Sequence, residues 1–350
     1  MEIKLIKVRI QVLYEHGVDF RPYSSSYIRM IRPLTYPKIS DKLEIIITPV
    51  LLDQPTDLVF LDRLWNRAVS SFDHSEKLIA KINDLKAKLI YFTDDDLSSE
   101  AVLGKGYTKD EIKIFKYFLQ NAHLIIVTTN YLKTRLSTYG TPILVIPNYL
   151  DERLIIHHLK HYSFNNGFLV GYMGTPTHNE DLNMVIPALI EFQKNHDDVI
   201  YEFVGAYNNS TFQNITSINN LKFHKLSPSP DESEYPLFYI WWTSSICWDL
   251  AIAPLQSNEF NLNKSDIKFL DYAAISVPGI FSDTLAYQST VPGRGILVKN
   301  TIEEWLTALE NLYNNRELIN SFRTEATKYL YSERILYHGV SKFNQIFDLI

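Results

Sequence analysis

The chain has 350 residues, of which 46% are hydrophobic and 21% charged, a composition that supports a globular protein of two domains. Its formal net charge of −6 argues against a general nucleic-acid binder, so we expect no nucleic-acid partner. Cys247 is the only cysteine, which excludes an internal disulfide and fits a reducing, cytoplasmic compartment.

The first 42 residues are more basic than the rest of the chain. They hold eight Lys or Arg and four Asp or Glu, a surplus of +4. Charges interrupt the apolar run of residues 1–10, so we expect a first strand there rather than a signal peptide. No apolar segment approaches the length of a membrane span. The basic surplus predicts either a solvated face or a peripheral contact with an anionic membrane.

Residues 1–160 are expected to form an α/β domain, because strand-like and helix-like segments alternate along them. This alternation predicts a parallel sheet with crossover helices. The predicted strands are Leu5–Leu13, Leu43–Thr48, Asp57–Leu61, Lys88–Phe92, Leu124–Thr128 and Ile143–Ile146. The predicted helices lie near Ser26–Leu34, Ser75–Ala87, Lys109–Asn121 and Tyr131–Ser137.

Polar residues follow two of these strands, and ligands of doubly wound sheets bind at the carboxyl ends of the strands. Arg63 follows the strand at 57–61, where its guanidinium can hold a phosphate or carboxylate or pair with acidic neighbours. The run Asp94–Asp96 follows the strand at 88–92 and predicts a solvated turn, a metal motif or an active-site carboxylate. Ser26 lies in the turn that opens the first helix, where it can cap that helix or border a ligand.

A strand ends at Pro147, and the polar stretch that continues to Asn166 is typical of an interdomain linker. A second alternation fills residues 161–332. Its predicted strands are Phe168–Met173, Val199–Val204, Leu221–His224, Leu250–Pro254, a strand after Gly279, and Gly295–Lys299. Its predicted helices are Asp181–Lys194, Tyr235–Ser244, a short helix after Ser265, Ile302–Tyr313 and Arg316–Tyr329, and a last helix is predicted at Glu333–Asp348. The aromatic block at 238–242 is expected to pack against the sheet rather than to stack on a sugar.

The turn at 171–181 connects the first strand of the second domain to its first helix. Gly174 would let a ligand approach the backbone closely, and the helix N-terminus favours phosphate. Thr177 and Glu180 have the spacing of a capping box, so helix capping explains Glu180 by itself. We therefore expect this turn to bind a ligand.

The segment from Asn263 to Asp283 predicts the central chemistry. Ser265 is a suitable N-cap for a short helix, on which Lys268 and Asp271 would share one face. Lys264 directly precedes the first turn, so its ammonium and the free amides of that turn would converge on one anion. These features predict a site for a diphosphate.

Two of these segments resemble known sequences. The pattern Lys264-Ser265-x-x-Lys268-x-x-Asp271-Tyr-Ala-Ala, followed by Val-Pro-Gly-Ile and Ser-Asp at 277–283, resembles the donor-site helix of retaining family-four glycosyltransferases. The run Gly-Thr-Pro-Thr-His at 174–178 resembles the G-[ST]-P-T-H element of bacterial polysaccharide transferases. Family-four glycosyltransferases usually have two glutamates separated by seven residues, and the corresponding positions here are Asn263 and Asp271.

The resemblance implies the GT-B architecture: two doubly wound Rossmann-like domains with an interdomain cleft, and a last helix, 333–350, that packs back on the first domain. It implies a glycosyltransferase that moves a sugar from a nucleoside-diphosphate donor to a carbohydrate or lipid-linked acceptor, with retention, in bacterial surface-polysaccharide synthesis at the cytoplasmic face. We expect no cofactor and no metal, because lysine ammonium groups would offset the charge of the leaving diphosphate.

The resemblance, together with the position of polar residues after the predicted strands, assigns roles to residues. The expected catalytic residues are Lys264, Lys268 and Asp95. The expected donor-binding residues are Gly174, Thr175, His178, Ser265 and Asp271. The expected acceptor-side residues are Arg63, Asp94 and Ser26.

Two alternatives stay open. A non-catalytic partner that binds a nucleotide-sugar or polysaccharide is favoured by Asn263 and by the shorter carboxylate of Asp271. A nucleotide-sugar epimerase of the same fold would need acid and base groups around the sugar ring, and the amide of Asn263 does not favour it.

Overall fold

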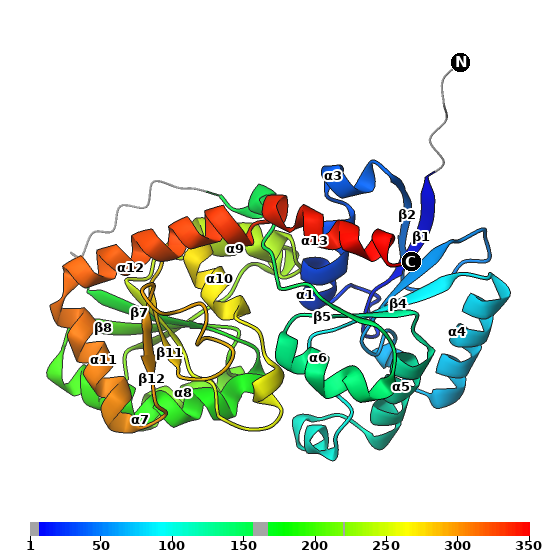
Figure 1. Cartoon of the computed structure of the whole chain (residues 1–350). Helices are drawn as coiled ribbons and strands as arrows, with labels where there is room; N and C mark the ends of the chain where they lie inside the picture. Colours follow the sequence, from blue (N-terminus) through cyan, green and yellow to red (C-terminus); the bar gives the residue numbers. More distant parts are fainter. Residues whose placement is uncertain (1–6, 157–166, 220) are drawn as a thin grey trace.

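The computed structural model describes residues 7–156, 167–219 and 221–350. Two parallel six-stranded sheets form two lobes, as Figure 1 shows, with helices on both faces of each sheet. The parts of the predicted strand Leu5–Leu13 and of the predicted linker that fall at 1–6 and 157–166 lie outside the described residues. The prediction of two doubly wound α/β domains is confirmed.

The first sheet has the strand order β2-β1-β3-β4-β5-β6. Its strands are β1 (Val8–Leu13), β2 (Leu43–Thr48), β3 (Leu58–Asp62), β4 (Lys88–Thr93), β5 (Leu124–Val127) and β6 (Ile143–Val145). Its helical elements are α1 (Ser24–Ser26), η1 (Tyr27–Ile31), α2 (Arg32–Leu34), α3 (Pro37–Ser40), η2 (Arg67–Val69), α4 (Phe72–Asp84), η3 (Glu100–Lys105), α5 (Lys109–Asn121), α6 (Asn130–Leu136), η4 (Ser137–Tyr139) and η5 (Glu152–Leu154). The strand order reverses between β1 and β3, which places a ligand-binding crevice at their carboxyl ends.

The second sheet has the order β12-β11-β10-β7-β8-β9, the strand order of a Rossmann fold. Its strands are β7 (Phe168–Met173), β8 (Val199–Val204), β9 (Phe223–Leu226), β10 (Leu250–Ala253), β11 (Gly279–Ser282) and β12 (Ile296–Val298). Its helical elements are η7 (Pro176–His178), α7 (Asn179–Asn195), α8 (Asn209–Asn219), η8 (Pro230–Glu232), α9 (Leu237–Ser245), η9 (Asn261–Asn263), α10 (Ile267–Ala274), α11 (Ile302–Asn314) and α12 (Arg316–Tyr329). The reversal lies between β7 and β10.

Alternate residues of each strand enter different cores, because both faces of a parallel sheet are covered by helices. In β3, Val59 and Leu61 pack with α4 and α5, whereas Leu58 and Phe60 face the other side. This two-sided burial explains why the strands read as continuous apolar runs. Trp242 and Trp248 are fully buried, which confirms that the aromatic block belongs to a core.

The end of the chain bridges the two domains. After α12, the segment η10 (Leu330–Arg334) leads into α13 (Leu336–Asp348), and Figure 1 shows α12 over one lobe and α13 over the other. Phe343 and Ile346 of α13 pack into the core that contains Ile10 and Phe60. The chain therefore crosses between the domains twice, at residues near Leu150 and again at η10. The backbone N–H of Leu336 donates to the carbonyl of Leu150, and this hydrogen bond joins the two crossovers.

Candidate active site

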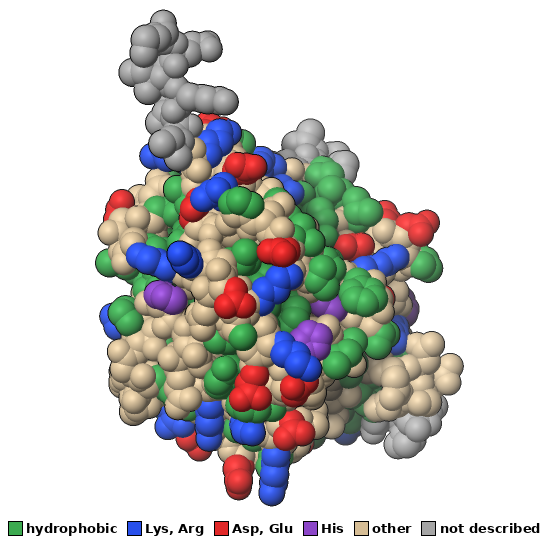
Figure 2. All heavy atoms as spheres, turned by 90° about the vertical axis from the view of Figure 1, so that its right-hand side faces the viewer, with side chains coloured by type: hydrophobic (Ala, Val, Ile, Leu, Met, Phe, Trp, Pro, Cys, Tyr) green, Lys and Arg blue, Asp and Glu red, His purple; other side chains and the backbone are tan. Residues whose placement is uncertain are grey.

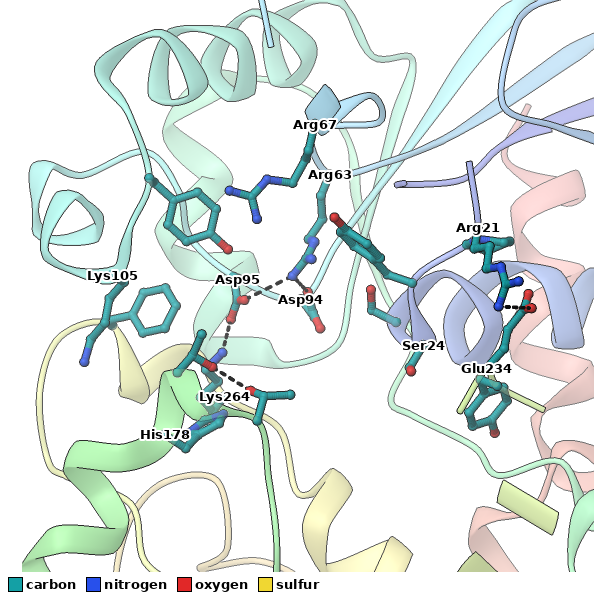
Figure 3. Close-up of a pocket in the computed structure, with 18 of the residues that line it drawn as sticks. Arg21, Ser24, Arg63, Arg67, Asp94, Asp95, Lys105, His178, Glu234 and Lys264 are labelled. Atoms are coloured by element: carbon teal, nitrogen blue, oxygen red, sulfur yellow. Dashed lines mark hydrogen bonds and ion pairs between the residues drawn. The ribbon is translucent and has the colours of Figure 1, made fainter. Parts of the chain in front are cut away.

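A cavity of about 630 Å³ lies between the two domains, at the carboxyl edges of both sheets. The loops after β1, β3 and β4 line it from one side, and the loop after β7 and the segment before α10 line it from the other. Figure 3 shows acidic and basic side chains from both domains that point into it. Six of the predicted site residues line it: Arg63, Asp94, Asp95, Thr175, His178 and Lys264.

The first domain contributes a network of buried ions. β3 ends at Asp62, whose carboxylate accepts bonds of 2.5 Å from Ser26 Oγ and 2.8 Å from Arg29 Nη2. The next residue, Arg63, has a left-handed backbone (φ 37°) and donates from Nε to Glu15 at 2.7 Å. Such a strained backbone in a non-glycine residue is held only where its surroundings fix it. The arginines are therefore oriented by acidic residues that follow neighbouring strands.

The three aspartates after β4 have different environments. Asp94 pairs with Arg29 and lies 3.5 Å from Arg63 Nη1. Although burial opposes its charge, these two guanidinium groups hold the pKa of Asp94 well below its usual range. Asp96 accepts from the backbone N–H of Ser98 and pairs with Arg135 outside the cavity. The carboxylates thus pair with cations, as the alternative interpretation of Arg63 predicts.

Asp95 is the aspartate that meets the second domain. Its Oδ1 atom lies 2.7 Å from Nζ of Lys264, and its Oδ2 atom lies 3.5 Å from Arg63 Nη1. The ammonium of Lys264 also lies 4.5 Å from the ring centroid of Phe260. Figure 3 shows this contact joining the two domains inside the cavity. Lys264 and Asp95, which are both predicted to be catalytic and lie far apart in the sequence, are therefore in direct contact.

Lys268 occupies a partly buried position behind the turn after β7. Its Nζ donates to the hydroxyl of Tyr172 at 3.0 Å and lies 4.4 Å from the centroid of that ring. Burial lowers the pKa of Lys268 to about 8. A Cβ atom at Gly174 would lie 2.5 Å from the same hydroxyl, so a glycine is required there for this arrangement.

His178 and Asp181 form a pair at the start of α7. The Nδ1 atom of His178 lies 2.9 Å from Oδ2 of Asp181. Burial, followed by the nearby charge of Lys268, lowers the pKa of His178 to about 4, so the imidazole is neutral at pH 7. The other oxygen of Asp181 accepts from the backbone N–H of Gln256 at 2.8 Å, which ties this turn to the segment after β10.

Asp271 lies on α10 with 6% of its surface exposed. Burial raises the pKa of its carboxyl to about 7, although Tyr239 and Lys268 oppose the shift. Lys268, Asp271, Gly174, Ser265 and Ser26 do not line the cavity.

Comparison with solved structures identifies the architecture. No protein-family model matches the sequence, and no curated protein matches it. HepE from Anabaena, in complex with UDP and glucose, has a TM-score of 0.70 and 12% identity and covers 98% of this chain and 100% of its own. Sucrose-phosphate synthase from Thermosynechococcus elongatus has a TM-score of 0.69 and 10% identity over 98% of each chain. A glycosyltransferase from Rickettsia africae has a TM-score of 0.65 and 13% identity over 97% of each chain. The chain has the GT-B fold.

Three local predictions within this GT-B fold are wrong. Asp266, not Ser265, is the N-cap residue of α10, and the hydroxyl of Ser265 accepts from Asn148 Nδ2 at 2.8 Å. Thr177 and Glu180 form no capping box, since Glu180 pairs with Lys105 of the first domain at 2.8 Å. The side chains of Ser265 and Glu180 bond instead to residues in segments far away in the sequence.

Ser26 is the third residue whose predicted position is wrong. This residue is fully buried, and its hydroxyl donates to Asp62 and accepts from the backbone N–H of Glu15 at 3.1 Å. It therefore holds the ion network in place, and neither borders the cavity nor caps α1. Ser24 and Ser25, the two residues before it, line the cavity instead.

Several residues that line the cavity were not predicted as site residues from the sequence. Glu234 accepts from the hydroxyl of Tyr27 at 3.0 Å and lies 3.7 Å from Arg21, again across the domains. Glu15, which orients Arg63 but does not itself line the cavity, lies two residues after the end of β1, so its position after a strand was the signal that could have found it. No comparable signal marks Glu234, because its partners come from the other domain.

The basic surplus of the first 42 residues is partly internal. Arg29 is buried between Asp62 and Asp94, and Arg32 pairs with the buried Asp151. Figure 2, which faces the first domain, shows Lys and Arg interspersed with Asp and Glu. Among residues 7–156, 167–219 and 221–350, no helix has the length and hydropathy that a bilayer crossing requires.

Proposed function

We propose that the protein transfers a glycosyl group from a nucleoside-diphosphate sugar to a carbohydrate or lipid-linked acceptor. The observation that carries this proposal is Lys264, an ammonium group in the interdomain cavity of a GT-B fold, opposite a carboxylate of the other domain. A GT-B structure that covers 98% of this chain, HepE, is in complex with UDP-glucose. The diphosphate would bind where Lys264, Lys268 and the turn at Gly174 meet.

The binding chemistry follows from the charges in the cavity. A diphosphate brings negative charge that competes with Asp95 for Lys264, and the partly buried ammonium of Lys268 lies behind the turn on the same side. Fixed ammonium groups and backbone amides stabilise the charge that develops on the leaving oxygen. Thr175 and the neutral His178 would contact the donor, and Asp271 would accept hydrogen bonds from its ribose. No metal is required by this proposal.

The reaction would proceed with retention, as in family-four glycosyltransferases. The anomeric carbon acquires positive, oxocarbenium-like character, which the carboxylate of Asp95 would offset once the diphosphate has taken Lys264. On the acceptor side, Asp94 stays ionised beside Arg29 and Arg63, so it would orient an acceptor hydroxyl by accepting its hydrogen bond. Closure of the cleft would exclude water and so limit hydrolysis of the donor.

A transfer assay and a donor-hydrolysis assay test the proposal. Wild type should cleave a nucleoside-diphosphate sugar, and Lys264→Ala should lower kcat/KM by roughly 10² to 10³, the effect of losing one charge-stabilising donor. Lys133→Ala, an exposed lysine on α6, is the matched control and should match wild type. Absence of cleavage with every common nucleotide-sugar would reject the enzymatic function.

We further propose that the acceptor belongs to a bacterial surface polysaccharide assembled at the cytoplasmic face of the membrane. A peripheral contact with anionic lipid is part of this proposal. Flotation with liposomes that contain or lack anionic lipid tests it, and equal recovery with both would reject the contact.

A second candidate is a non-catalytic partner that binds a nucleotide-sugar. It is favoured by Asn263, which stands where the family has a glutamate and is 1% exposed, with its amide donating to the carbonyls of Glu259 and Phe260 at 3.2 Å. This candidate predicts that wild type binds a nucleotide, and that neither wild type nor Lys264→Ala cleaves the nucleotide-sugar.

A further inference from the structure

Arg334 joins three segments at the side where the domains are connected. It ends η10 and is buried. Its guanidinium donates to both carboxylate oxygens of Asp266, at 2.7 and 2.9 Å, and twice to the carbonyl oxygen of Asn148, at 3.1 and 3.0 Å. A fifth bond, of 3.2 Å, goes to the hydroxyl of Tyr329. All five N–H groups of the guanidinium therefore have an acceptor.

The partners of Arg334 place it at the start of the donor helix. Asp266 is the N-cap residue of α10, and its Oδ2 atom also accepts from Thr290 at 2.7 Å. Asn148 belongs to the crossover from the first domain to the second, and its amide donates to Ser265, the residue before Asp266. Both interdomain crossovers and the beginning of α10 thus meet at one side chain.

Backbone contacts reinforce this junction. The N–H of Leu150 donates to the carbonyl of Arg334 at 2.9 Å, and the N–H of Leu336 donates to the carbonyl of Leu150 at 2.8 Å. These bonds hold the two crossovers together, but they do not reach α10. Hydrogen bonds of the Arg334 and Asn148 side chains connect the crossovers to residues 265–266.

The energetics favour an orienting role. A buried ion pair adds little net stability, because the loss of hydration of both charges largely offsets their attraction. The planar fork of an arginine, however, fixes the directions of five donors, and this specifies a geometry that an apolar pair would leave undefined. Lys264 lies two residues before Asp266, so the orientation of this junction determines where its ammonium lies relative to Asp95.

We propose that Arg334 is a positioning residue for glycosyl transfer: through Asp266 and the Asn148 carbonyl it fixes the donor helix relative to the first domain. Its kinetic consequence rests on the proposed function, whereas its geometric consequence does not. Both can be measured with Arg334→Lys, which keeps the charge but loses the planar fork.

The geometric test measures the distance between the domains. Spin labels are placed on Cys247 of the second domain and on Lys116→Cys of the first, both exposed positions. Without ligand, pulsed electron–electron double resonance should give a narrow distribution of label-to-label distances in wild type, and Arg334→Lys should broaden it at least twofold. The control is Arg153→Lys, because Arg153 lies in the same linker, donates to Asp151 at 2.8 Å and lies 4.7 Å from the ring centroid of Tyr36 in the first domain. Superimposable distributions for Arg334→Lys and wild type would overturn the proposal.

The kinetic test separates positioning from stability. In Arg334→Lys, kcat should fall at least tenfold while the Kd for UDP rises less than threefold, because the lysines that hold the diphosphate stay within the second domain. A purely structural role would lower Tm and leave kcat of the folded enzyme unchanged, which contradicts the proposal. Asp266→Asn should give the same broadening and serves if the lysine variant does not fold. If wild type has no transferase activity, the proposed function fails, and the distance measurement still decides the geometric claim.

Discussion

Lys264 and Asp95 are 169 positions apart in the sequence, and their charged atoms lie 2.7 Å apart across the cleft between the domains. The aspartate is 4% exposed, so little water screens the contact. Without a ligand, the ammonium expected to bind the diphosphate is therefore occupied by a carboxylate of the first domain. Donor binding has to exchange one anion for another.

Replacing Asp95 separates its two expected effects. Asp95→Asn removes the anion that competes for Lys264, so the Kd for UDP should fall about threefold to tenfold. The same change removes the carboxylate beside the reacting sugar, so kcat for transfer should fall at least tenfold. Calorimetry and a transfer assay measure the two quantities. Weaker UDP binding by the variant would show that the pair organises the site rather than competing with the ligand.

Gly174 provides a test of the turn after β7. In Gly174→Ala, the new methyl group would lie 2.5 Å from the hydroxyl of Tyr172 and displace the acceptor that holds Lys268. The Kd for UDP should rise at least tenfold. Gly104→Ala is the matched control, because a Cβ there would meet no atom within 4 Å. Equal affinities of the two variants would exclude a role of this turn in donor binding.

The partly buried ammonium of Lys268 predicts a pH dependence. Burial lowers its pKa from 10.5 to about 8 in the free protein. Since the charged form is the one proposed to bind the diphosphate, deprotonation of Lys268 should make kcat/KM fall above pH 8. Arginine stays charged at every accessible pH, so Lys268→Arg should lose this alkaline limb. A pH profile without a limb near 8, or the same limb in the variant, would contradict this assignment.

Asp271 predicts a pH-dependent stability. Burial raises its pKa from 3.8 to about 7, so between these values the folded state keeps a proton that the unfolded state has lost. Stability from this group is therefore lost as the pH rises from about 4 to 7, on the order of 2–4 kcal/mol. Asp271→Asn should remove this loss. Melting curves at pH 5 and pH 8 check it, and a decrease in Tm as large in the variant as in wild type would refute the interpretation.

Strands were the easiest elements to predict, because their sequences carry the pattern of two-sided burial. Leu43–Thr48, Phe168–Met173 and Val199–Val204 have the predicted bounds. The helix α8, at Asn209–Asn219, was not predicted, since its sequence is mostly polar and has few apolar positions to mark a buried face. The strand β9 begins two residues later than expected, at Phe223.

The site was only partly predictable, for a related reason. Lys264 and His178 precede or open helices, and Arg63 and Asp95 follow strands, so their place in the chain indicates the carboxyl edge of a sheet. Which polar side chain reaches the cavity depends on partners elsewhere. The hydroxyl of Ser26 donates to Asp62, and the hydroxyl of Ser265 accepts from Asn148. Pairings between the two domains are not encoded in the spacing of residues.

The central claim is that a nucleoside diphosphate binds in the cleft at Lys264. Isothermal titration calorimetry with UDP, GDP, ADP and TDP tests it most directly, on wild type, Lys264→Ala and the control Lys133→Ala. We expect at least one nucleotide to bind wild type and Lys133→Ala with equal affinity and to bind Lys264→Ala at least thirtyfold more weakly. Binding of no nucleotide to wild type, or equal binding to all three proteins, would contradict the claim.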